Sequence, residues 1–194
     1  MKSFFALSAF AFLLLAFTAA PISYRIDSSQ SKVTWTGYKV TGQHTGVVPV
    51  RTGDLQFDNG QLVGGDILID MAALTVTDLT GEMKGKLEGH LKSPDFFGVE
   101  KHPTAKLTID KVTSRGKAGD VRINGQLTIK ETTRPVKFNA QLVERGNQVV
   151  GTAELTIDRT EYNVRYGSGS FFDNLGDNTI YDEFDLKIEL VANK

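Results

Sequence analysis

Residues 121–130 read Val-Arg-Ile-Asn-Gly-Gln-Leu-Thr-Ile-Lys, and this stretch decides the class of fold. Apolar residues and one glycine occupy every second position, and polar or charged residues stand between them. Successive side chains of a β-strand point to opposite faces, so this spacing predicts a strand with one dry face and one solvated face.

The same alternation recurs along most of the chain. It predicts eight strands, at residues 33–40, 47–57, 61–71, 105–111, 121–130, 136–142, 149–157 and 184–190. Residues 24–27 form a possible short ninth strand. The apolar phase shifts near Gly53, which indicates a β-bulge.

Two connections carry clear turn signals. Residues 58–60 (Asp-Asn-Gly) and 145–147 (Arg-Gly-Asn) separate successive strands and contain residues that tolerate left-handed backbone angles. They predict antiparallel hairpins. Eight antiparallel strands can close into a barrel or form two packed sheets, and the pattern alone favours neither.

Residues 79–92 depart from the alternation. Apolar side chains recur there at every fourth position, which predicts the single substantial helix. Glycines at positions 81, 85 and 89 each cost about 1 kcal/mol relative to alanine. We therefore expect this helix to form only when its leucine side docks on the rest of the protein.

The composition excludes several classes of function. The chain has no cysteine, so it has no disulfide, thiolate nucleophile or lipidated cysteine. Its formal net charge is −1 and its acids and bases are interleaved, so we expect no nucleic-acid binding.

The N-terminus has the order of a secretory signal peptide: Lys2, an apolar run over residues 4–17, and small residues up to Ala20. We expect residues 1–20 to be this signal and residues 21–194 to form one domain that is periplasmic or secreted. Pro21 would follow the scissile bond, which leaves the cleavage site open. A retained membrane anchor is the alternative, although the apolar run is short for a bilayer core of roughly 30 Å.

Chemical motifs are sparse. His44, His90 and His102 have no metal-ligand spacing, so neither a metal site nor a cofactor is expected. Residues 167–170 are glycine-rich but lack the Lys-Ser/Thr of a phosphate loop. An enzyme remains an alternative, a hydrolase or isomerase that would use Asp95, His102 or Asp158 at one pocket.

Four strings, at residues 87–109, 125–136, 158–162 and 165–177, together resemble the YceI family. The resemblance implies a secreted, lipocalin-like, eight-stranded antiparallel barrel with one short helix at its rim, and a role as a carrier of polyisoprenoids and similar long-chain amphiphiles. One residue departs from the family pattern, because Glu131 stands where a glycine is usual. If that glycine supplies a permissive backbone, the turn between the strand ending at Lys130 and the one starting near Arg134 is expected to differ.

A barrel of eight strands can hold one small ligand or be filled by its own side chains. For a long-chain isoprenoid or fatty amphiphile, the expected hydrophobic lining is the apolar phase of the strands: Trp35, Phe57, Ile67, Ile69, Leu107, Ile109, Leu127, Ile129, Phe138, Leu155, Ile157, Phe184 and Leu186. The expected rim or gate residues come from the helix, a Phe-Phe pair and a glycine-rich loop: Leu87, Leu91, Phe96, Phe97, Arg165, Tyr166, Phe171 and Phe172.

The sequence is compatible with alternatives for the barrel interior, the glycine-rich loop and the partners. A filled barrel would make the protein a structural or stress-related envelope domain rather than a carrier. In the glycine-rich loop, Arg165 would either meet an anionic head or belong to a packed closure of the barrel. Transient membrane contact and a homodimer are both compatible with the sequence.

Overall fold

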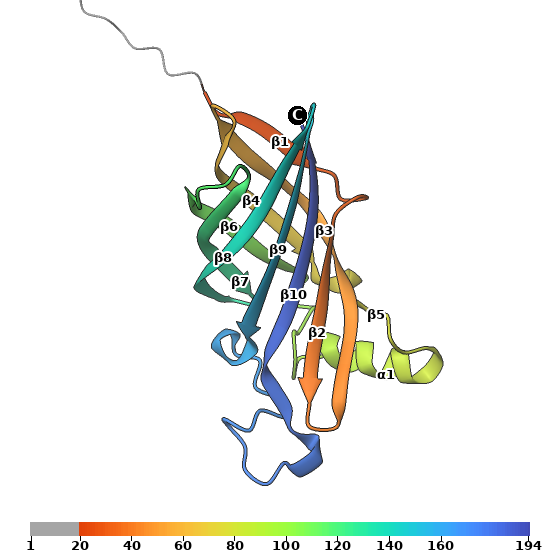
Figure 1. The fold of residues 1–194 in the computed structure, drawn as a ribbon. Coiled ribbons are helices and arrows are strands. Elements are labelled where there is room, and N and C mark those ends of the chain that lie inside the picture. The colour runs from red at the N-terminus through yellow and green to blue at the C-terminus, as the bar shows by residue number, and fades with distance from the viewer. Residues whose placement is uncertain (1–19) are drawn as a thin grey trace, which may run out of the picture.

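The computed structural model describes residues 20–194. The expected signal peptide, residues 1–20, lies outside the described residues except for Ala20. The rest of the chain folds into a closed antiparallel β-barrel with an α-helix at one end (Figure 1).

Eight strands build the barrel wall, and all eight were predicted. They are β2 (Lys32–Lys39), β3 (Gly42–Asp58), β4 (Gln61–Asp70), β6 (Thr104–Ser114), β7 (Asp120–Ile129), β8 (Thr132–Arg145), β9 (Gln148–Asp158) and β10 (Ile180–Asn193). They pair antiparallel in this order, and β10 pairs with both β9 and β2, which closes the barrel. β3 and β8 begin several residues earlier than predicted. Residues 42–46 and 132–135 lack the alternation of apolar and polar side chains, so the sequence pattern did not reveal them as strand.

The ninth strand, β1 (Ile22–Ile26), is also present. It occupies the same position in the wall as β2, between β10 and β3, but at the opposite end of the barrel. Between β1 and β2 the chain leaves the wall in a turn held by Asp27, whose side chain accepts hydrogen bonds from Ser29 and Gln30. Ser31 then restores the pairing, because its Oγ accepts a hydrogen bond of 2.9 Å from the Val191 amide.

The alternation in the sequence determines which side chains face inward. On β7, for example, Ile123, Leu127 and Ile129 are buried, whereas Arg122 is exposed. The same holds around the wall, and the inward side chains form one continuous apolar core. The barrel therefore has a dry interior and a polar outer face.

The predicted bulge lies two residues from its expected place. The register of β3 and β4 shifts between Val50 and Thr52, just before Gly53. A Cβ atom at Gly53 would lie 2.6 Å from the Asp66 carbonyl oxygen, so only glycine fits where the strand bends.

Both predicted hairpin turns are confirmed. Asn59 and Gly60 have φ angles of 49° and 76°, and Gly146 has a φ of 64°. In the turn between β7 and β8, Lys130 carries the left-handed backbone, with a φ of 55°. The turn therefore does not require a glycine at position 131, where this chain has glutamate.

The helix α1 (Gly81–Lys92) docks through its C-terminal half alone. Leu91 is buried and Leu87 half-buried, whereas Met83 is 61% exposed and Leu79 precedes the helix. The expectation that the leucine side docks is confirmed, since Leu79, Leu87 and Leu91 pack against the core, whereas Met83 on the same stripe does not. Met83 lies on the first turns of the helix, which extend past the barrel wall (Figure 1).

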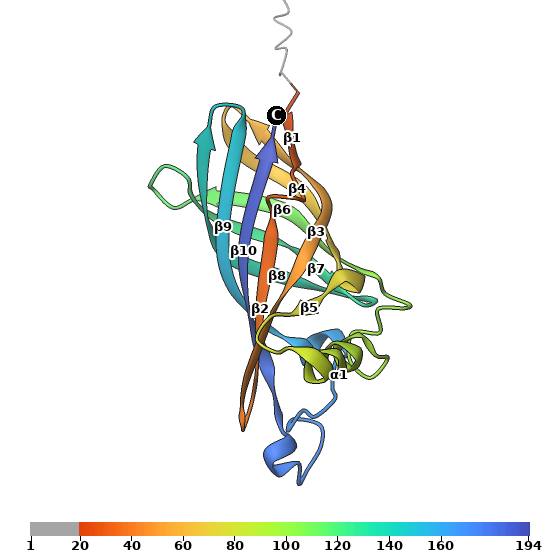
Figure 2. The same cartoon turned by 90° about the vertical axis from the view of Figure 1, so that its right-hand side faces the viewer.

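Shorter elements complete the same end of the barrel. They are η1 (Met71–Ala73), β5 (Thr75–Val76), η2 (Arg159–Tyr162) and η3 (Gly176–Asn178). We call this end the mouth: it consists of α1, the β2–β3 turn, and residues 159–179, which connect β9 to β10 (Figures 1 and 2). Among residues 20–194, no helix is long and apolar enough to cross a membrane, and no cluster of three or more acidic, histidine or cysteine side chains is arranged to hold a metal ion.

Phe138 and Lys137 test the inward and outward assignment. They are neighbours on β8, and Phe138 is buried while Lys137 is exposed. Phe138→Ala should lower the free energy of unfolding by about 3 to 5 kcal/mol, because it leaves a cavity in the core. Lys137→Ala should change it by less than about 0.5 kcal/mol. Urea unfolding of the two variants measures this difference, and similar losses would contradict the assignment.

Candidate functional site: an apolar cavity at the mouth of the barrel

A cavity of about 120 Å³ lies inside the barrel at the mouth. Its wall is almost entirely apolar and comes from β2, β10, the ends of β4 and β7, and the segment after α1. Six of the predicted lining residues lie on it: Trp35, Ile69, Leu127, Ile129, Phe184 and Leu186. We call this space the inner cavity.

The other seven predicted lining residues lie outside the wall of the inner cavity. All but Leu155 are buried in the core, and Leu155 is half-buried against it; the seven are Phe57, Ile67, Leu107, Ile109, Phe138, Leu155 and Ile157. Three of them are direct cross-strand partners of lining residues: Leu107 pairs with Leu127, Leu155 with Leu186, and Ile157 with Phe184. The alternation identifies the inward face of a strand, but it does not tell which inward side chains border the space that is left unfilled.

A larger and more open space, the outer cleft, adjoins the inner cavity. Its volume is about 920 Å³, and the two spaces share Trp35, Leu91, Phe96 and Ile180 in their walls. The two spaces are therefore adjacent. By comparison, a dry cavity of about 150 Å³ holds a single benzene ring. The inner cavity is thus somewhat smaller than a space that holds one small aromatic ring.

Most of the predicted rim residues surround these two spaces. Leu91, Phe96 and Phe97 line the inner cavity. Leu87, Tyr166 and Phe172 line the outer cleft. Arg165 and Phe171 line neither the inner cavity nor the outer cleft. They contact each other instead, with the Arg165 guanidinium 4.4 Å from the centre of the Phe171 ring. Arg165 is therefore not directed at a ligand head in the cleft.

Arg159 is one of the wall residues that the sequence did not predict, as are Val33, Gly37, Tyr38, Val48, Met71, Leu74, Ala105, Ile180, Tyr181 and Glu183. Arg159 is buried, lines the inner cavity, and donates hydrogen bonds to the carbonyl oxygens of Val164, Ile180 and Tyr181 at 2.8 to 3.0 Å. Burial lowers the pKa of its guanidinium, and the nearby Asp182 carboxylate opposes this. Its donors are thus used to join η2 to the start of β10, and its aliphatic stem is available to the cavity.

The three side chains considered for catalysis do not converge. Asp158 accepts hydrogen bonds from the amide and hydroxyl of Thr160, so it caps η2. Asp95 lines the outer cleft, whereas His102 lines neither space. No acid and base pair among these three residues therefore meets at one pocket.

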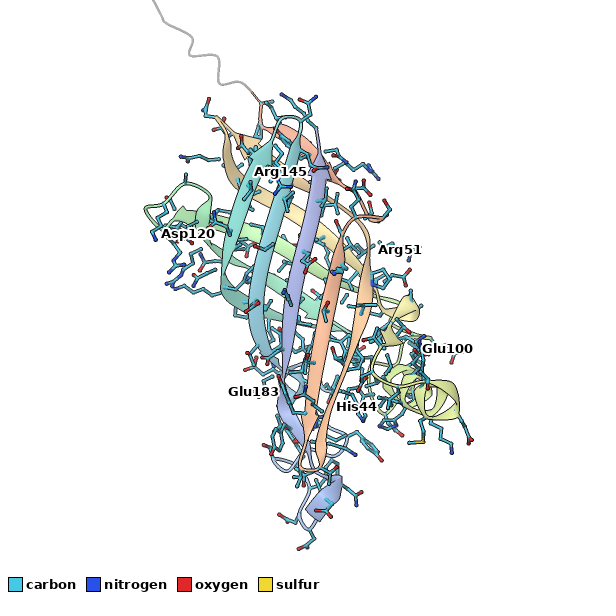
Figure 3. The ribbon with its side chains drawn as sticks, turned by 45° about the vertical axis from the view of Figure 1, so that its right-hand side comes forward. His44, Arg51, Glu100, Asp120, Arg145 and Glu183 are labelled. Atoms are coloured by element: carbon cyan, nitrogen blue, oxygen red, sulfur yellow. The ribbon has the colours of Figure 1, made fainter. Side chains whose placement is uncertain are left out.

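A single carboxylate connects α1 to the barrel. Glu88 Oε1 accepts hydrogen bonds from Thr75 Oγ1 at 2.5 Å and from the Val76 amide at 2.8 Å. Both hydrogen bonds lower the pKa of Glu88, and the bond from Thr75 has the larger effect. A second anchor precedes the helix, where Asp78 accepts a hydrogen bond from the Thr45 amide and lies 2.8 Å from His44 Nδ1. Figure 3 shows His44 on β3, on the side where α1 lies.

Burial raises the pKa of Asp78, but the hydrogen bonds from His44 and Thr45 outweigh it, so the pKa lies below its ordinary value. Both anchoring carboxylates are therefore ionised at neutral pH. Each of these two carboxyl groups has a lower pKa in the folded protein than in the unfolded chain. Their ionised forms therefore stabilise the fold fully when the pH lies above the ordinary pKa of a carboxyl group. This stabilisation is lost as the pH falls through the lowered pKa values of the folded protein.

Fold and site together define a lipocalin-like barrel with an apolar cavity under a helical rim. The chain belongs to the YceI family, because the model of the YceI-like domain matches residues 24–192. A UPF0312 protein from Shewanella baltica is 27% identical over 91% of each chain. One from Pectobacterium carotovorum is 37% identical over 81 residues, which cover 39% of this chain and 41% of that relative.

Solved structures show the same fold. The crystal structure of BcnA from Burkholderia cenocepacia has a TM-score of 0.70 at 22% identity and covers 87% of this chain and 99% of BcnA. A polyisoprenoid-binding domain from Saccharophagus degradans has a TM-score of 0.61 at 13% identity and covers 88% of this chain and 97% of that domain.

The Glu88 anchor can be tested on the helix itself. Glu88→Ala should leave the Thr75 hydroxyl and the Val76 amide at β5 without their charged acceptor, and the amides of α1 should exchange with solvent about tenfold faster, since a hydrogen bond to a charged group contributes about 1.5 kcal/mol or more. Hydrogen exchange with mass spectrometry measures this rate.

Glu82→Ala is the matched control. Glu82 lies on the same helix with its side chain 80% exposed and pairs only with Lys86 in the described structure. Its replacement makes the same change of residue type, yet should leave the exchange of α1 within about twofold of the wild-type rate. Equal acceleration in the two variants would show that Glu88 is not the anchor.

Proposed function

We propose that this protein binds the chain of a polyisoprenoid or another long amphiphile and carries it between membranes or proteins. The observation that supports this most directly is the inner cavity, whose apolar wall shares residues with the adjoining outer cleft. The solved domain from Saccharophagus degradans, described as polyisoprenoid-binding, has the same fold.

The two volumes suggest how a ligand would lie. Each buried methylene contributes about 0.8 kcal/mol, and association costs roughly 4 to 15 kcal/mol, so about ten or more apolar carbons must leave water. The inner cavity of about 120 Å³ is too small for that number. We infer that one end of the chain enters the barrel and that the remainder lies in the outer cleft, against Leu87, Tyr166 and Phe172.

Binding rather than catalysis is the better account of the mouth. The candidates Asp95, His102 and Asp158 are dispersed, and Arg159 has its donors occupied by backbone carbonyls. The filled-barrel alternative, a structural or stress-related envelope domain, fits the closed end of the barrel, where large side chains pack tightly. It does not explain why an apolar cavity persists at the other end.

The carrier role also needs a place to load. Exposed aromatic and aliphatic side chains gather at the mouth: Val40, Tyr166, Phe171, Phe172 and Tyr181. Such side chains suit the interface of a lipid bilayer. We propose that the mouth touches a membrane during loading, and that residues 1–20 direct export to the periplasm or the exterior. The intact mass of the protein recovered from its cell envelope tests the export.

Leu186→Trp tests whether the inner cavity holds the chain. A larger side chain there should fill the space and weaken binding of geranylgeraniol by at least about tenfold. Ile188→Trp is the control, because Ile188 lies two residues further along the same face of β10 but outside the cavity wall. Titration calorimetry gives both affinities, and thermal melting checks the fold. Unchanged binding in Leu186→Trp would contradict the proposal.

Phe171→Ser tests the membrane contact. Phe171 is 46% exposed and lines neither the cavity nor the cleft, so the equilibrium affinity for geranylgeraniol should stay the same. Transfer of the ligand from phosphatidylcholine vesicles to the protein should slow several-fold. Val143→Ser removes a comparably exposed side chain from β8, close to Arg145 at the end opposite the mouth (Figure 3), and should not slow it. Equal transfer rates for the two variants would contradict the docking of the mouth.

A further inference from the structure

Two residues that line the outer cleft each carry a buried polar atom that has no partner. Among the described residues, three buried side-chain nitrogen or oxygen atoms make no hydrogen bond: Trp35 Nε1, His90 Nε2 and Ser93 Oγ. Trp35 and His90 both line the outer cleft. Buried polar groups are nearly always hydrogen-bonded, and leaving one without a partner costs free energy. Two such atoms in one cleft indicate that something else satisfies them.

Trp35 holds its indole rigidly at the junction of the two spaces. It is 91% buried and lines both the inner cavity and the outer cleft. A Cβ atom at Gly46, the residue opposite Trp35 on β3, would lie 2.5 Å from the indole ring, so the ring packs directly on the glycine backbone. Because an indole can only donate through Nε1, its unmet partner must be an acceptor.

His90 brings the second atom from the last turn of α1. Its ring makes edge contacts with Tyr166 at 4.4 Å and with Phe96 at 5.6 Å between ring centres. These aromatic neighbours fix the position of the imidazole but offer no hydrogen bond to Nε2. A neutral imidazole nitrogen can donate or accept, so Nε2 can serve either an ether or carbonyl oxygen or a hydroxyl group.

The charges around the cleft argue against an anionic head. Its wall carries Lys39 but also Asp95 and Asp177, and His44 is already paired with Asp78. Arg159, in the inner cavity, uses its donors on backbone carbonyls, and Arg165 stacks on Phe171 outside the cleft. A phosphate or diphosphate would therefore meet two carboxylates and only one free ammonium group.

From this juxtaposition we propose that Trp35 Nε1 and His90 Nε2 bind the polar head of the ligand, and that this head is uncharged and carries a hydrogen-bond acceptor, such as a hydroxyl or carbonyl oxygen. The aromatic rings of Phe96 and Tyr166 enclose the head, and the apolar chain runs from it along the outer cleft until its far end enters the inner cavity. This inference rests on the proposed function, since it assigns the head-binding part of the same site.

Three ligands with one common tail separate the contributions of head and chain. Farnesol has an uncharged acceptor head, farnesyl diphosphate has a charged head, and farnesene has no polar head. Their affinities are measured by displacement of the neutral fluorescent probe N-phenyl-1-naphthylamine from the wild-type protein and from Trp35→Phe and His90→Phe. Both substitutions keep an aromatic ring in place and remove the nitrogen.

We expect the wild-type protein to bind farnesol at least about tenfold more tightly than farnesene, because a site built to hydrogen-bond an oxygen discriminates against the analogue that lacks it. Farnesyl diphosphate should bind no more tightly than farnesol. Each substitution should weaken the affinity for farnesol several-fold and leave the affinity for farnesene within about twofold of the wild-type value. The preference for the ligand with the hydroxyl group should therefore fall.

Other results would overturn the assignment. Equal weakening of farnesol and farnesene in the variants would mean that the two rings only pack against the chain. Tightest binding of farnesyl diphosphate would mean that the head is anionic. If farnesene and farnesol bind equally well to the wild-type protein, Trp35 and His90 do not bind the head, but the binding of an apolar chain at the mouth is still supported. If none of the three displaces the probe, the proposed function fails as well.

Discussion

Pairing of the strand β10 on both of its edges is the constraint on which the rest of this structure depends. Backbone amide and carbonyl groups along a strand need partners, and closing a sheet into a barrel provides them for every strand of the wall. β10 bonds to β9 along one edge and to β2 and then β1 along the other, from the mouth to the opposite end. The register of these pairs fixes which side chains face inward and where the cavity lies.

The barrel interior is divided along its length. At the end away from the mouth, large side chains such as Phe57, Ile109 and Phe138 fill it. At the mouth the wall includes Gly37, which has no side chain, and Ala105, whose side chain is a single methyl group, and their neighbours do not fill the space that is left. This division explains how one short barrel can be stable through its own core and still present an apolar cavity, because the two roles are met at different heights.

Polar groups at the mouth fall into two kinds. Arg159 and Glu88 have partners: Arg159 joins η2 to β10 through backbone carbonyls, and Glu88 joins α1 to β5. They hold the rim in place at little cost, because each charge is hydrogen-bonded. Trp35 and His90 each leave a nitrogen without a partner in the same region. The satisfied groups build the site, and the unsatisfied ones are the groups on which a ligand can gain specificity.

The sequence by itself determined the strands, the two hairpin turns, the bulge and the inward face of each strand, because a period of two residues is a local property of the chain. It also predicted the helix and, through the resemblance, the closed barrel. Only the tertiary structure decided which inward residues meet the cavity, so that Leu127 lines it while Phe138 on the neighbouring strand packs the core. It alone brought Arg159, His90 and Trp35 to one end. Height along the barrel depends on strand tilt and register between segments far apart in the sequence, and no local pattern encodes these.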